Sequence, residues 1–174
     1  MAFDVDRALV LKAASGDREA FRQLAEQLKD EVFNLSWRMT FNREDAEDLS
    51  QETFITLFRN FHRYDTSLPF APWFRRVFTN VALNYRRRLK PSRMLPEDAP
   101  DPKETEPAND DAQIVEAALK TLPNEYRLVV TFKYYQELGV DEIARLMKVP
   151  VGTVKVWLFR AREALKQKLE RIFA

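Results

Sequence analysis

The chain has 174 residues, of which 45% are hydrophobic, and it carries 28 Lys and Arg against 27 Asp and Glu. This composition can build one domain or two small ones, and no apolar run approaches the roughly 20 residues that a membrane-spanning helix needs. The lack of cysteine excludes disulfides, thiol nucleophiles and thiolate zinc sites, and a single histidine provides poorly for metal binding or histidine catalysis. We expect a cytoplasmic protein without a metal, a cofactor or membrane insertion.

The expected fold is all-α, because glycines are few and no segment alternates convincingly like a strand. The sequence "SGD" at 15–17 should end a first helix and let Asp17 cap a second, and Asn42 should cap a third. A two-proline loop, "SLPFAP", should precede a fourth helix from about residue 72. Four more helices are expected over about 111–121, 124–137, 140–147 and 151–172.

Charge is strongly segregated along the chain. Residues 1–90 hold 15 Lys and Arg against 13 acids, residues 91–112 hold 2 against 7, and residues 113–174 hold 11 against 7. No acid occurs in 66–96 or in 143–162. Because a merely solvated surface usually mixes both signs, two acid-free stretches suggest two surfaces for a polyanion.

The middle segment is rich in proline and acid and poor in apolar residues, so it predicts a flexible linker. Stretched out, such a linker would span about 70 Å. We therefore expect two small helical domains, over 1–90 and 113–174, joined by an acidic linker over 91–112.

The third predicted helix has two different faces. The apolar face carries Ala46, Leu49, Thr53, Leu57 and Phe61. The opposite face is acidic with one apolar residue, and it carries Asp45, Asp48, Glu52, Ile55 and Arg59. The acids could simply favour the positive end of the helix dipole, whereas an exposed isoleucine among carboxylates favours a surface that docks a protein.

The fourth predicted helix has an apolar and a basic side. We expect burial of Phe74, Val77, Phe78, Val81 and Tyr85, with Arg76, Asn80 and Arg87 opposite and an adjoining strip of Arg75, Thr79 and Arg86. Most aromatic residues at helical spacing belong to a core. Tyr64, Phe70 and Trp73, however, flank a proline loop beside arginines, a combination that stacks unpaired bases and holds their phosphates. Asn80 has the donor and the acceptor needed to recognise a base edge.

The sequence "GVDEIARLMKVPVGTVKVWLFRAREAL" predicts a helix, a three-residue turn and a second helix. Its small core would contain Ile143, Met147, Val149, Val154 and Leu158, as in a helix-turn-helix unit. The second helix would present Lys155, Val156, Phe159 and Arg160 outward, with Arg162 toward one flank. Such a helix is sized for the major groove of DNA.

These segments together resemble the extracytoplasmic-function (ECF) sigma factors, small sigma-70 family subunits of bacterial RNA polymerase. "DAEDLSQETFITLFRN" and "FAPWFRRVFTNVALNYRRR" are similar to sigma region 2, and "LPNEYRLVVTFKYYQELGVDEIARLMKVPVGTVKVWLFRAREAL" is similar to region 4. The resemblance covers nearly the whole chain. It implies a promoter-specificity subunit that is not an enzyme and has no catalytic residue or small-molecule substrate.

The resemblance also implies partners and contact residues. It implies docking on the beta-prime clamp helices of core polymerase through Asp45, Asp48, Glu52, Ile55 and Arg59. It implies capture of the minus-ten element by Tyr64, Phe70, Trp73, Asn80 and Asn84, with Arg76, Arg86, Arg87 and Arg88 on phosphates. It implies recognition of the minus-thirty-five element by Thr153, Lys155, Val156, Phe159, Arg160 and Arg162. The beta flap and an anti-sigma factor are further expected partners.

One departure from the family bears on the minus-thirty-five preference. Val156 and Trp157 stand where the family commonly has a Ser-Arg pair, so a hydrogen-bonding group and a phosphate contact are both missing. Val156 could touch a thymine methyl, and Trp157 could pack inward or lie along the sugar-phosphate edge. Two other functions stay open at this point: a sigma-like decoy for an anti-sigma factor, and a stand-alone helix-turn-helix regulator.

Overall fold

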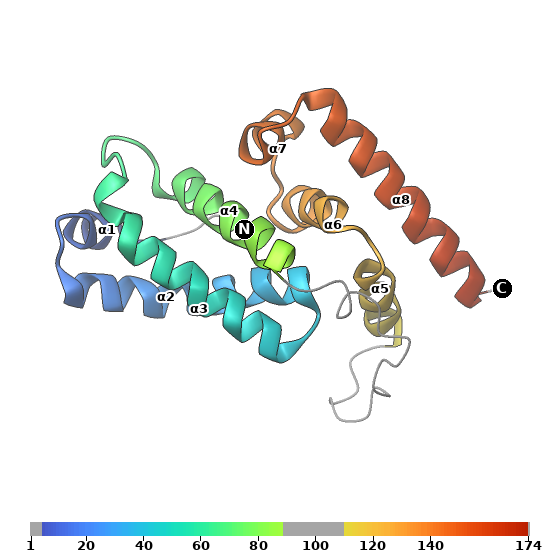
Figure 1. Cartoon of the computed structure of the whole chain (residues 1–174), viewed down its shortest axis with the longest axis horizontal. Helices are drawn as coiled ribbons and strands as arrows, with labels where there is room; N and C mark the ends of the chain where they lie inside the picture. Colours follow the sequence, from blue (N-terminus) through green and yellow to red (C-terminus); the bar gives the residue numbers. More distant parts are fainter. Residues whose placement is uncertain (1–4, 89–109, 174) are drawn as a thin grey trace.

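The computed structural model describes residues 5–88 and 110–173, and the regular elements in both stretches are helices (Figure 1). The first stretch contains α1 (Arg7–Ala14), α2 (Arg18–Thr40), α3 (Arg43–Asn60), a 3-10 turn (Phe61–Arg63) and α4 (Phe70–Arg88). The second contains α5 (Asp110–Lys120), α6 (Asn124–Val130), a π-helical turn (Thr131–Tyr135), α7 (Val140–Met147) and α8 (Val151–Phe173). The predicted all-α architecture is confirmed, and most of the expected linker lies outside the described residues.

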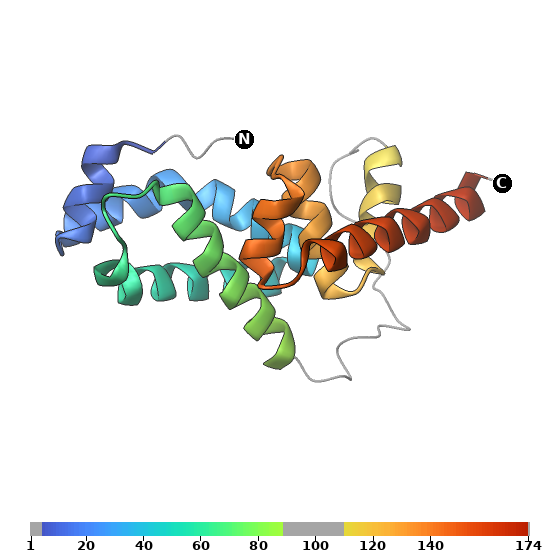
Figure 2. The same ribbon diagram turned by 90° about the horizontal axis from the view of Figure 1, so that it is seen from above.

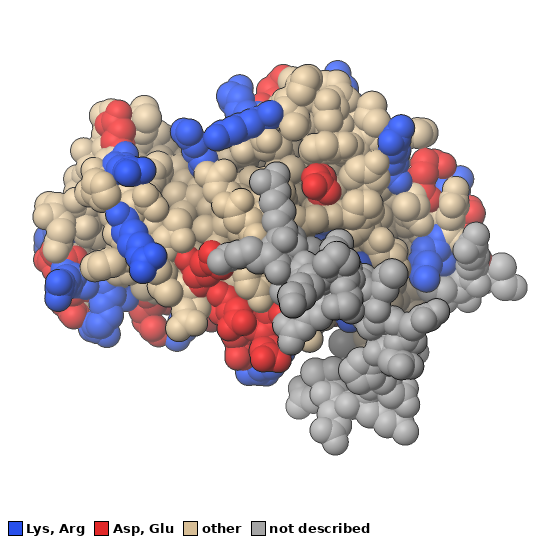
Figure 3. Space-filling model, in the orientation of Figure 1, with Lys and Arg blue, Asp and Glu red and all other residues tan. Residues whose placement is uncertain are grey.

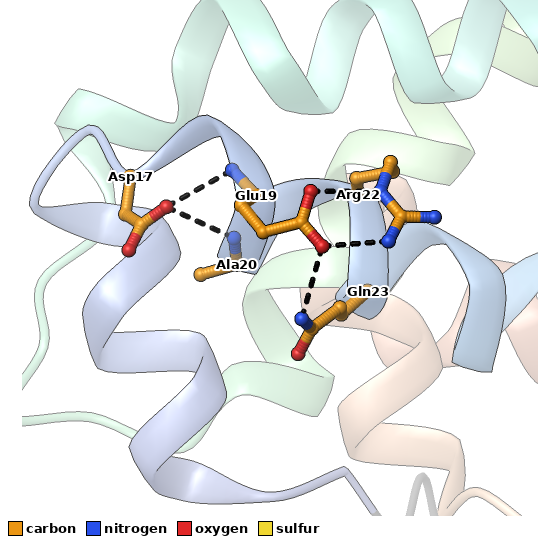
Figure 4. Close-up of polar contacts among 5 residues, drawn as sticks. All are labelled: Asp17, Glu19, Ala20, Arg22 and Gln23. Atoms are coloured by element: carbon orange, nitrogen blue, oxygen red, sulfur yellow. Dashed lines mark hydrogen bonds and ion pairs between the residues drawn. The ribbon is translucent and has the colours of Figure 1, made fainter.

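Both predicted N-caps are confirmed. The Asp17 carboxylate accepts hydrogen bonds from the backbone N–H groups of Glu19 (2.9 Å) and Ala20 (3.1 Å) at the start of α2 (Figure 4). The Asn42 side chain accepts from the backbone N–H of Asp45 at 3.0 Å at the start of α3. Each cap satisfies a backbone donor that has no partner within its helix.

The first turns of α2 also contain a surface ion pair. Arg22 donates to both carboxylate oxygens of Glu19, and Gln23 donates to one of them (Figure 4). The hydrogen bonds from Arg22 and then from Gln23 lower the pKa of Glu19 to about 2.

Removing the cap of α2 should measurably destabilise the fold. We expect Asp17→Ala to lower the free energy of unfolding by about 1 kcal/mol, because the N–H groups of Glu19 and Ala20 lose their acceptor. Denaturant titration followed by circular dichroism measures this loss. Asp17→Asn is the matched control, since its amide oxygen can still cap the helix. Equal losses for the two variants would contradict the capping role.

Helix α4 begins earlier than the sequence predicted, at Phe70 rather than near residue 72. Pro72 therefore lies within the first turn. Proline is tolerated there because the first N–H groups of a helix have no intrahelical acceptor. The loop before α4 is correspondingly shorter than expected.

The apolar faces of the first four helices form a common core. Helix α2 contributes Leu24, Leu28, Val32, Leu35 and Met39, which follow one another at helical spacing and are all buried. All five residues of the predicted apolar face of α3 are buried as well. Phe74 and Phe78 of α4 are fully buried against them. The predicted amphipathic faces of α3 and α4 are thus confirmed where they meet the core.

The C-terminal helices pack directly on the N-terminal ones. Helix α6 contacts α2 and α4, and α7 contacts α4, while α8 projects away from the N-terminal helices (Figures 1 and 2). In the parts of the chain that the structure describes, none of the helices has the length and hydropathy to cross a bilayer.

Candidate nucleic-acid interface

The outer face of α3 is charged and partly apolar. Asp48 and Arg59 are exposed, Glu52 is half-buried, and Ile55 keeps 44% of its surface accessible. Asp45 is half-buried and accepts a hydrogen bond from the Tyr85 hydroxyl of α4 at 3.1 Å. Acidic atoms gather over the N-terminal part of α3 in Figure 3. The structure thus places an accessible isoleucine on an acidic helix face, as the sequence predicted.

The outer side of α4 carries polar side chains above an apolar base. Val81 is buried and Val77 and Tyr85 are half-buried, whereas Arg76, Asn80 and Asn84 are exposed. The side chains of Arg86, Arg87 and Arg88 lie outside the described residues. Arg76 and Asn80 are thus both accessible to solvent, and both lie within the acid-free stretch 66–96.

The aromatic residues around the loop before α4 form a cluster rather than an open stacking surface. Tyr64 and Phe70 are only 8% and 7% exposed. Their ring centroids lie 5.9 Å apart, and the Tyr64 ring lies 5.1 Å from that of Trp73. Burial raises the pKa of Tyr64, whose hydroxyl donates to the Leu68 carbonyl. The rings of Tyr64 and Phe70 are thus packed against each other and against Phe61 and Trp73, in a mixture of edge-to-face, stacked and tilted contacts.

Two surfaces remain accessible around this cluster. Trp73 is half-buried at its edge, and Leu68 in the adjoining loop is 56% exposed. Of the three aromatic residues proposed from the sequence to face an unpaired base, the structure leaves Trp73 the most open. Leu68 was not identified from the sequence, because its exposure depends on the loop conformation.

Arg75 and Thr79 correct the sequence analysis, which expected them on a solvent-facing strip. Arg75 is 8% exposed and Thr79 is fully buried. The Arg75 Nε donates to the Gln136 amide oxygen at 3.2 Å, and its Nη1 lies 3.6 Å from a Glu142 carboxylate oxygen. Burial lowers the pKa of Arg75, while Glu142 and then Glu31 oppose this shift. Arg75 is covered because the C-terminal residues Gln136 and Glu142 pack on this side of α4.

The predicted helix-turn-helix is confirmed in α7 and α8. Ile143 and Val154 are fully buried between the two helices, and Ala144 permits their close approach. The turn begins at Lys148, which adopts the left-handed conformation with φ 55° and donates its N–H to the Ala144 carbonyl. A left-handed residue at this position is a common way to end a helix.

The outward face of α8 carries the residues that the sequence proposed for the minus-thirty-five element. Val156 is 46% exposed and Phe159 is 58% exposed. Lys155, Arg160 and Arg162 are exposed, and Thr153 is half-buried. No acid lies between Val151 and Arg162, so this face can approach phosphates without repulsion.

Tyr126 of α6 is a neighbour of this face that the sequence analysis missed. Its ring centroid lies 6.4 Å from that of Trp157, and its hydroxyl accepts from the Arg160 Nη1 at 3.5 Å. Trp157 is half-buried, so its ring packs toward α6. No local pattern connects residues that lie so far apart in the sequence.

A groove of about 470 Å³ lies where α5, α6 and α8 meet the end of α2. Its lining has three arginines and no acid among apolar and aromatic side chains: Arg38, Phe41, Val115, Leu119, Arg127, Val130, Thr131, Tyr134, Tyr135, Arg162 and Leu165. Val115 is 44% and Tyr134 58% exposed. The groove can accept an apolar segment with acidic flanks. The sequence analysis did not identify it, because its walls come from four helices.

Comparison with known proteins identifies the family to which this chain belongs. The family model for Sigma-70 region 2 matches residues 24–91, and that for Sigma-70, region 4, matches residues 112–165. The ECF RNA polymerase sigma factor SigW of Bacillus subtilis is 31% identical over 182 residues, covering 92% of this chain and 94% of the relative. The chain belongs to the ECF sigma factors of the sigma-70 family. The resemblance that the motifs indicated is therefore confirmed for this sigma factor.

A second relative and two solved structures are similar to this sigma factor. ECF sigma factor SigE of Mycolicibacterium smegmatis is 36% identical over 170 residues, covering 91% of this chain and 66% of the relative. CnrH, in complex with the cytosolic domain of CnrY, has a TM-score of 0.69, 23% identity and coverage of 97% and 99%. RpoE of Bartonella quintana, in complex with the anti-sigma factor NepR, has a TM-score of 0.67 and 19% sequence identity, and the match covers 86% of this chain and 96% of RpoE. The two structures show that the sigma factor shares their fold.

Proposed function

We propose that this ECF sigma factor divides promoter-specific initiation among three of its helices. Helix α3 docks on core polymerase, α4 captures the minus-ten element, and α8 recognises the minus-thirty-five element. The observation that carries this division is charge: α4 has no acid and α8 has none up to Arg162, whereas the outer face of α3 carries Asp45, Asp48 and Glu52. We assign residues 1–90 to docking and melting, 113–174 to minus-thirty-five recognition, and 91–112 to an acidic linker.

The docking surface on core polymerase would have two parts. The outer face of α3 offers carboxylates around the exposed Ile55, which suits the beta-prime clamp helices through Asp45, Asp48, Glu52, Ile55 and Arg59. The apolar groove between α5, α6 and α8 suits the beta flap. The polymerase would supply all of the catalysis.

The minus-ten element would be captured as an unpaired strand on α4. Arg76 would hold phosphate, together with Arg86, Arg87 and Arg88, and the exposed amides of Asn80 and Asn84 would contact bases. Trp73 offers a ring for stacking, and the buried Tyr64 and Phe70 support it from below. Stacking would partly offset the few kcal/mol that extruding a base costs.

Asn80 should determine base preference more than overall affinity. We expect Asn80→Ala in the holoenzyme to reduce discrimination between the preferred and the other bases by about tenfold, because the amide no longer pairs with a base edge. Binding to a set of single-stranded minus-ten oligonucleotides measures this effect. Arg76→Ala is the comparison variant, and it should flatten the salt dependence while keeping the base preference. The reverse assignment of the two effects would contradict the proposal.

The minus-thirty-five element would be recognised in the major groove by Thr153, Lys155, Val156, Phe159, Arg160 and Arg162. Val156 and Phe159 are exposed apolar groups, which suit contacts with thymine methyl groups. Tyr126 supports Arg160 and Trp157 from α6. Because the side chains differ from the commoner Ser-Arg pair, we expect a minus-thirty-five preference distinct from that of such relatives.

An anti-sigma factor is a further proposed partner. The similar RpoE of Bartonella quintana forms a complex with the anti-sigma factor NepR. On this chain, such a partner would cover the acidic face of α3 and the apolar groove.

Run-off transcription with purified core polymerase across genomic DNA tests the proposed function. The expected result is initiation at defined promoters only when this chain is added. A chain that does not bind core polymerase would overturn the proposal. Tight binding to duplex DNA without polymerase would instead favour a stand-alone regulator.

A further inference from the structure

The loop before α4, residues 64–69, connects the 3-10 turn to the helix proposed to capture the minus-ten element. Leu68 in this loop is 56% exposed, whereas the neighbouring Tyr64 and Phe70 are buried and Trp73 is half-buried. One exposed apolar side chain needs no explanation by itself, because such residues are common on protein surfaces. The backbone that carries Leu68, however, is held by several polar contacts.

The first of these contacts lie within the loop itself. The Leu68 N–H donates to the Asp65 carbonyl at 3.1 Å, which closes a turn. The Asp65 carboxylate accepts from the Ser67 hydroxyl at 2.7 Å and from the Ser67 N–H at 2.9 Å, and these two bonds lower the pKa of Asp65. An aspartate that accepts from the backbone two residues further on is a common way to fix a turn. Leu68 is therefore the last residue of an ordered turn.

Tyr64 connects the end of this turn to the aromatic cluster. Its hydroxyl donates to the Leu68 carbonyl, and its ring centroid lies 5.1 Å from that of Trp73. The same ring lies 6.0 Å from Phe61 and 5.9 Å from Phe70, so it is fixed on several sides. Tyr64 is only 8% exposed, and little water can compete for its hydroxyl. One side chain therefore sets the position of Leu68 relative to Trp73.

Helix α1 holds the same loop from its outer side. The Arg7 guanidinium donates to the Thr66 carbonyl at 3.3 Å, and α1 packs on the 3-10 turn that precedes the loop. Burial raises the pKa of Tyr64, and the nearby Arg7 opposes this rise. Arg7 thus lies close to Tyr64 as well as to the turn. The functions proposed above involve α3, α4 and α8, and they leave α1 without a role.

We propose that Tyr64 is a positioning residue, whose hydroxyl holds the loop so that Leu68 contacts the captured base. Arg7 supports the same loop from α1. The indole of Trp73 would offer one apolar surface to the base and the leucine a second. A loop that is already fixed loses less conformational freedom on binding, which favours capture. The inference rests on the proposed capture of an unpaired base beside α4, and it moves Tyr64 from the stacking surface to the support of that surface.

The hold on the loop is tested on the full chain, without polymerase or DNA. Tyr64→Phe removes the hydroxyl and keeps the ring, so the aromatic packing is retained. We expect the Leu68 amide to exchange its hydrogen with solvent about threefold faster or more, because the turn opens more often without the bond to the Leu68 carbonyl. NMR measures this exchange. An unchanged rate would overturn the positioning role of Tyr64.

Arg7→Ala tests the part that α1 plays, with Arg18→Ala as its matched control. Arg7 is the first residue of α1 and Arg18 the first residue of α2, both are exposed, and both substitutions remove one positive charge. We expect exchange at Ser67 and Leu68 to be about twofold faster in Arg7→Ala than in the control, since an exposed hydrogen bond contributes less than a buried one. Equal exchange in the two variants would overturn the role of α1.

The contact with the base is tested in the holoenzyme with single-stranded minus-ten oligonucleotides. We expect Leu68→Ala to weaken binding by about fivefold and Tyr64→Phe by about threefold. Amide exchange at position 68 should stay within about twofold in Leu68→Ala, because that variant keeps the turn. Both losses should disappear on a strand with an abasic site at the captured position, because a contact cannot be lost twice. That position is the one whose base contributes most to binding by the unmodified holoenzyme.

The abasic strand separates a contact with the base from a general structural effect. Losses that persist on that strand would overturn the assignment, and so would normal binding by Leu68→Ala. Faster exchange in Tyr64→Phe with unchanged binding would overturn its role in capture. An unmodified holoenzyme that does not bind the single strand would overturn the proposed minus-ten capture, and with it the contact of Leu68. A negative exchange result would overturn only the positioning by Tyr64, so the two failures are distinguishable.

Discussion

Reversing the charge of Asp48 should weaken binding of the sigma factor to core polymerase by about tenfold or more. Asp48 is exposed on the outer face of α3, close in sequence to the acids that gather there in Figure 3. An arginine at this position would oppose a basic partner surface directly, and like charges facing each other across an interface cost several kcal/mol. Fluorescence anisotropy of the labelled sigma factor titrated with core polymerase measures the change.

Asp30→Arg provides the control for Asp48→Arg. Asp30 is exposed on α2, outside the proposed docking face, and its replacement gives the same change in net charge. We expect its affinity for core polymerase to stay within about twofold of the unmodified chain, since exposed charges away from an interface matter little. If both variants weaken binding equally, overall charge rather than the α3 face controls docking.

Removing the Arg160 side chain should lower promoter binding while leaving core binding intact. Arg160 is exposed on α8 and lies beside Phe159, the most open apolar residue of that face. One arginine contact to a base is worth about 1–3 kcal/mol, so we expect Arg160→Ala to reduce promoter affinity of the holoenzyme by about tenfold. Gel-shift titration of the reconstituted holoenzyme measures the loss.

Lys166→Ala is the control for Arg160→Ala, because it removes a positive charge from α8 outside the face proposed to contact DNA. Lys166 also lies on α8 and is exposed, but it is farther along the helix and its ammonium lies 3.9 Å from Glu170. It should affect promoter affinity much less than Arg160. A loss of core binding in the Arg160 variant that matches its loss of promoter binding would contradict the proposed division between α3 and α8.

The helices and their faces could be predicted from the sequence because their signals are local. Asp17 and Asn42 cap the helices that follow them, and the capping groups lie within three residues. The buried face of α3 repeats at helical spacing, so its burial against a core follows from periodicity alone. Helix-turn-helix residues such as Ile143 and Val154 were identified for the same reason.

The surroundings of individual side chains depended on how the chain folds back on itself. Tyr64 and Phe70 carry the composition of a stacking surface, but the folded loop packs their rings against Phe61 and Trp73. Arg75 repeats with the basic side of α4, but a residue 61 positions away covers it. Periodicity shows which side of a helix can be buried, and it does not show what packs on the other side.

The sequence by itself determined the family, the helices, and the charge of the surfaces on α3, α4 and α8. Only the tertiary structure decided that the two halves close on each other and that Gln136 joins Arg75 to Glu31. The contact between Gln136 and Glu31 joins residues 105 positions apart, and no short-range pattern encodes such a pair. The physical reason is that burial of a polar group depends on which partner satisfies it, and only the folded chain brings that partner near.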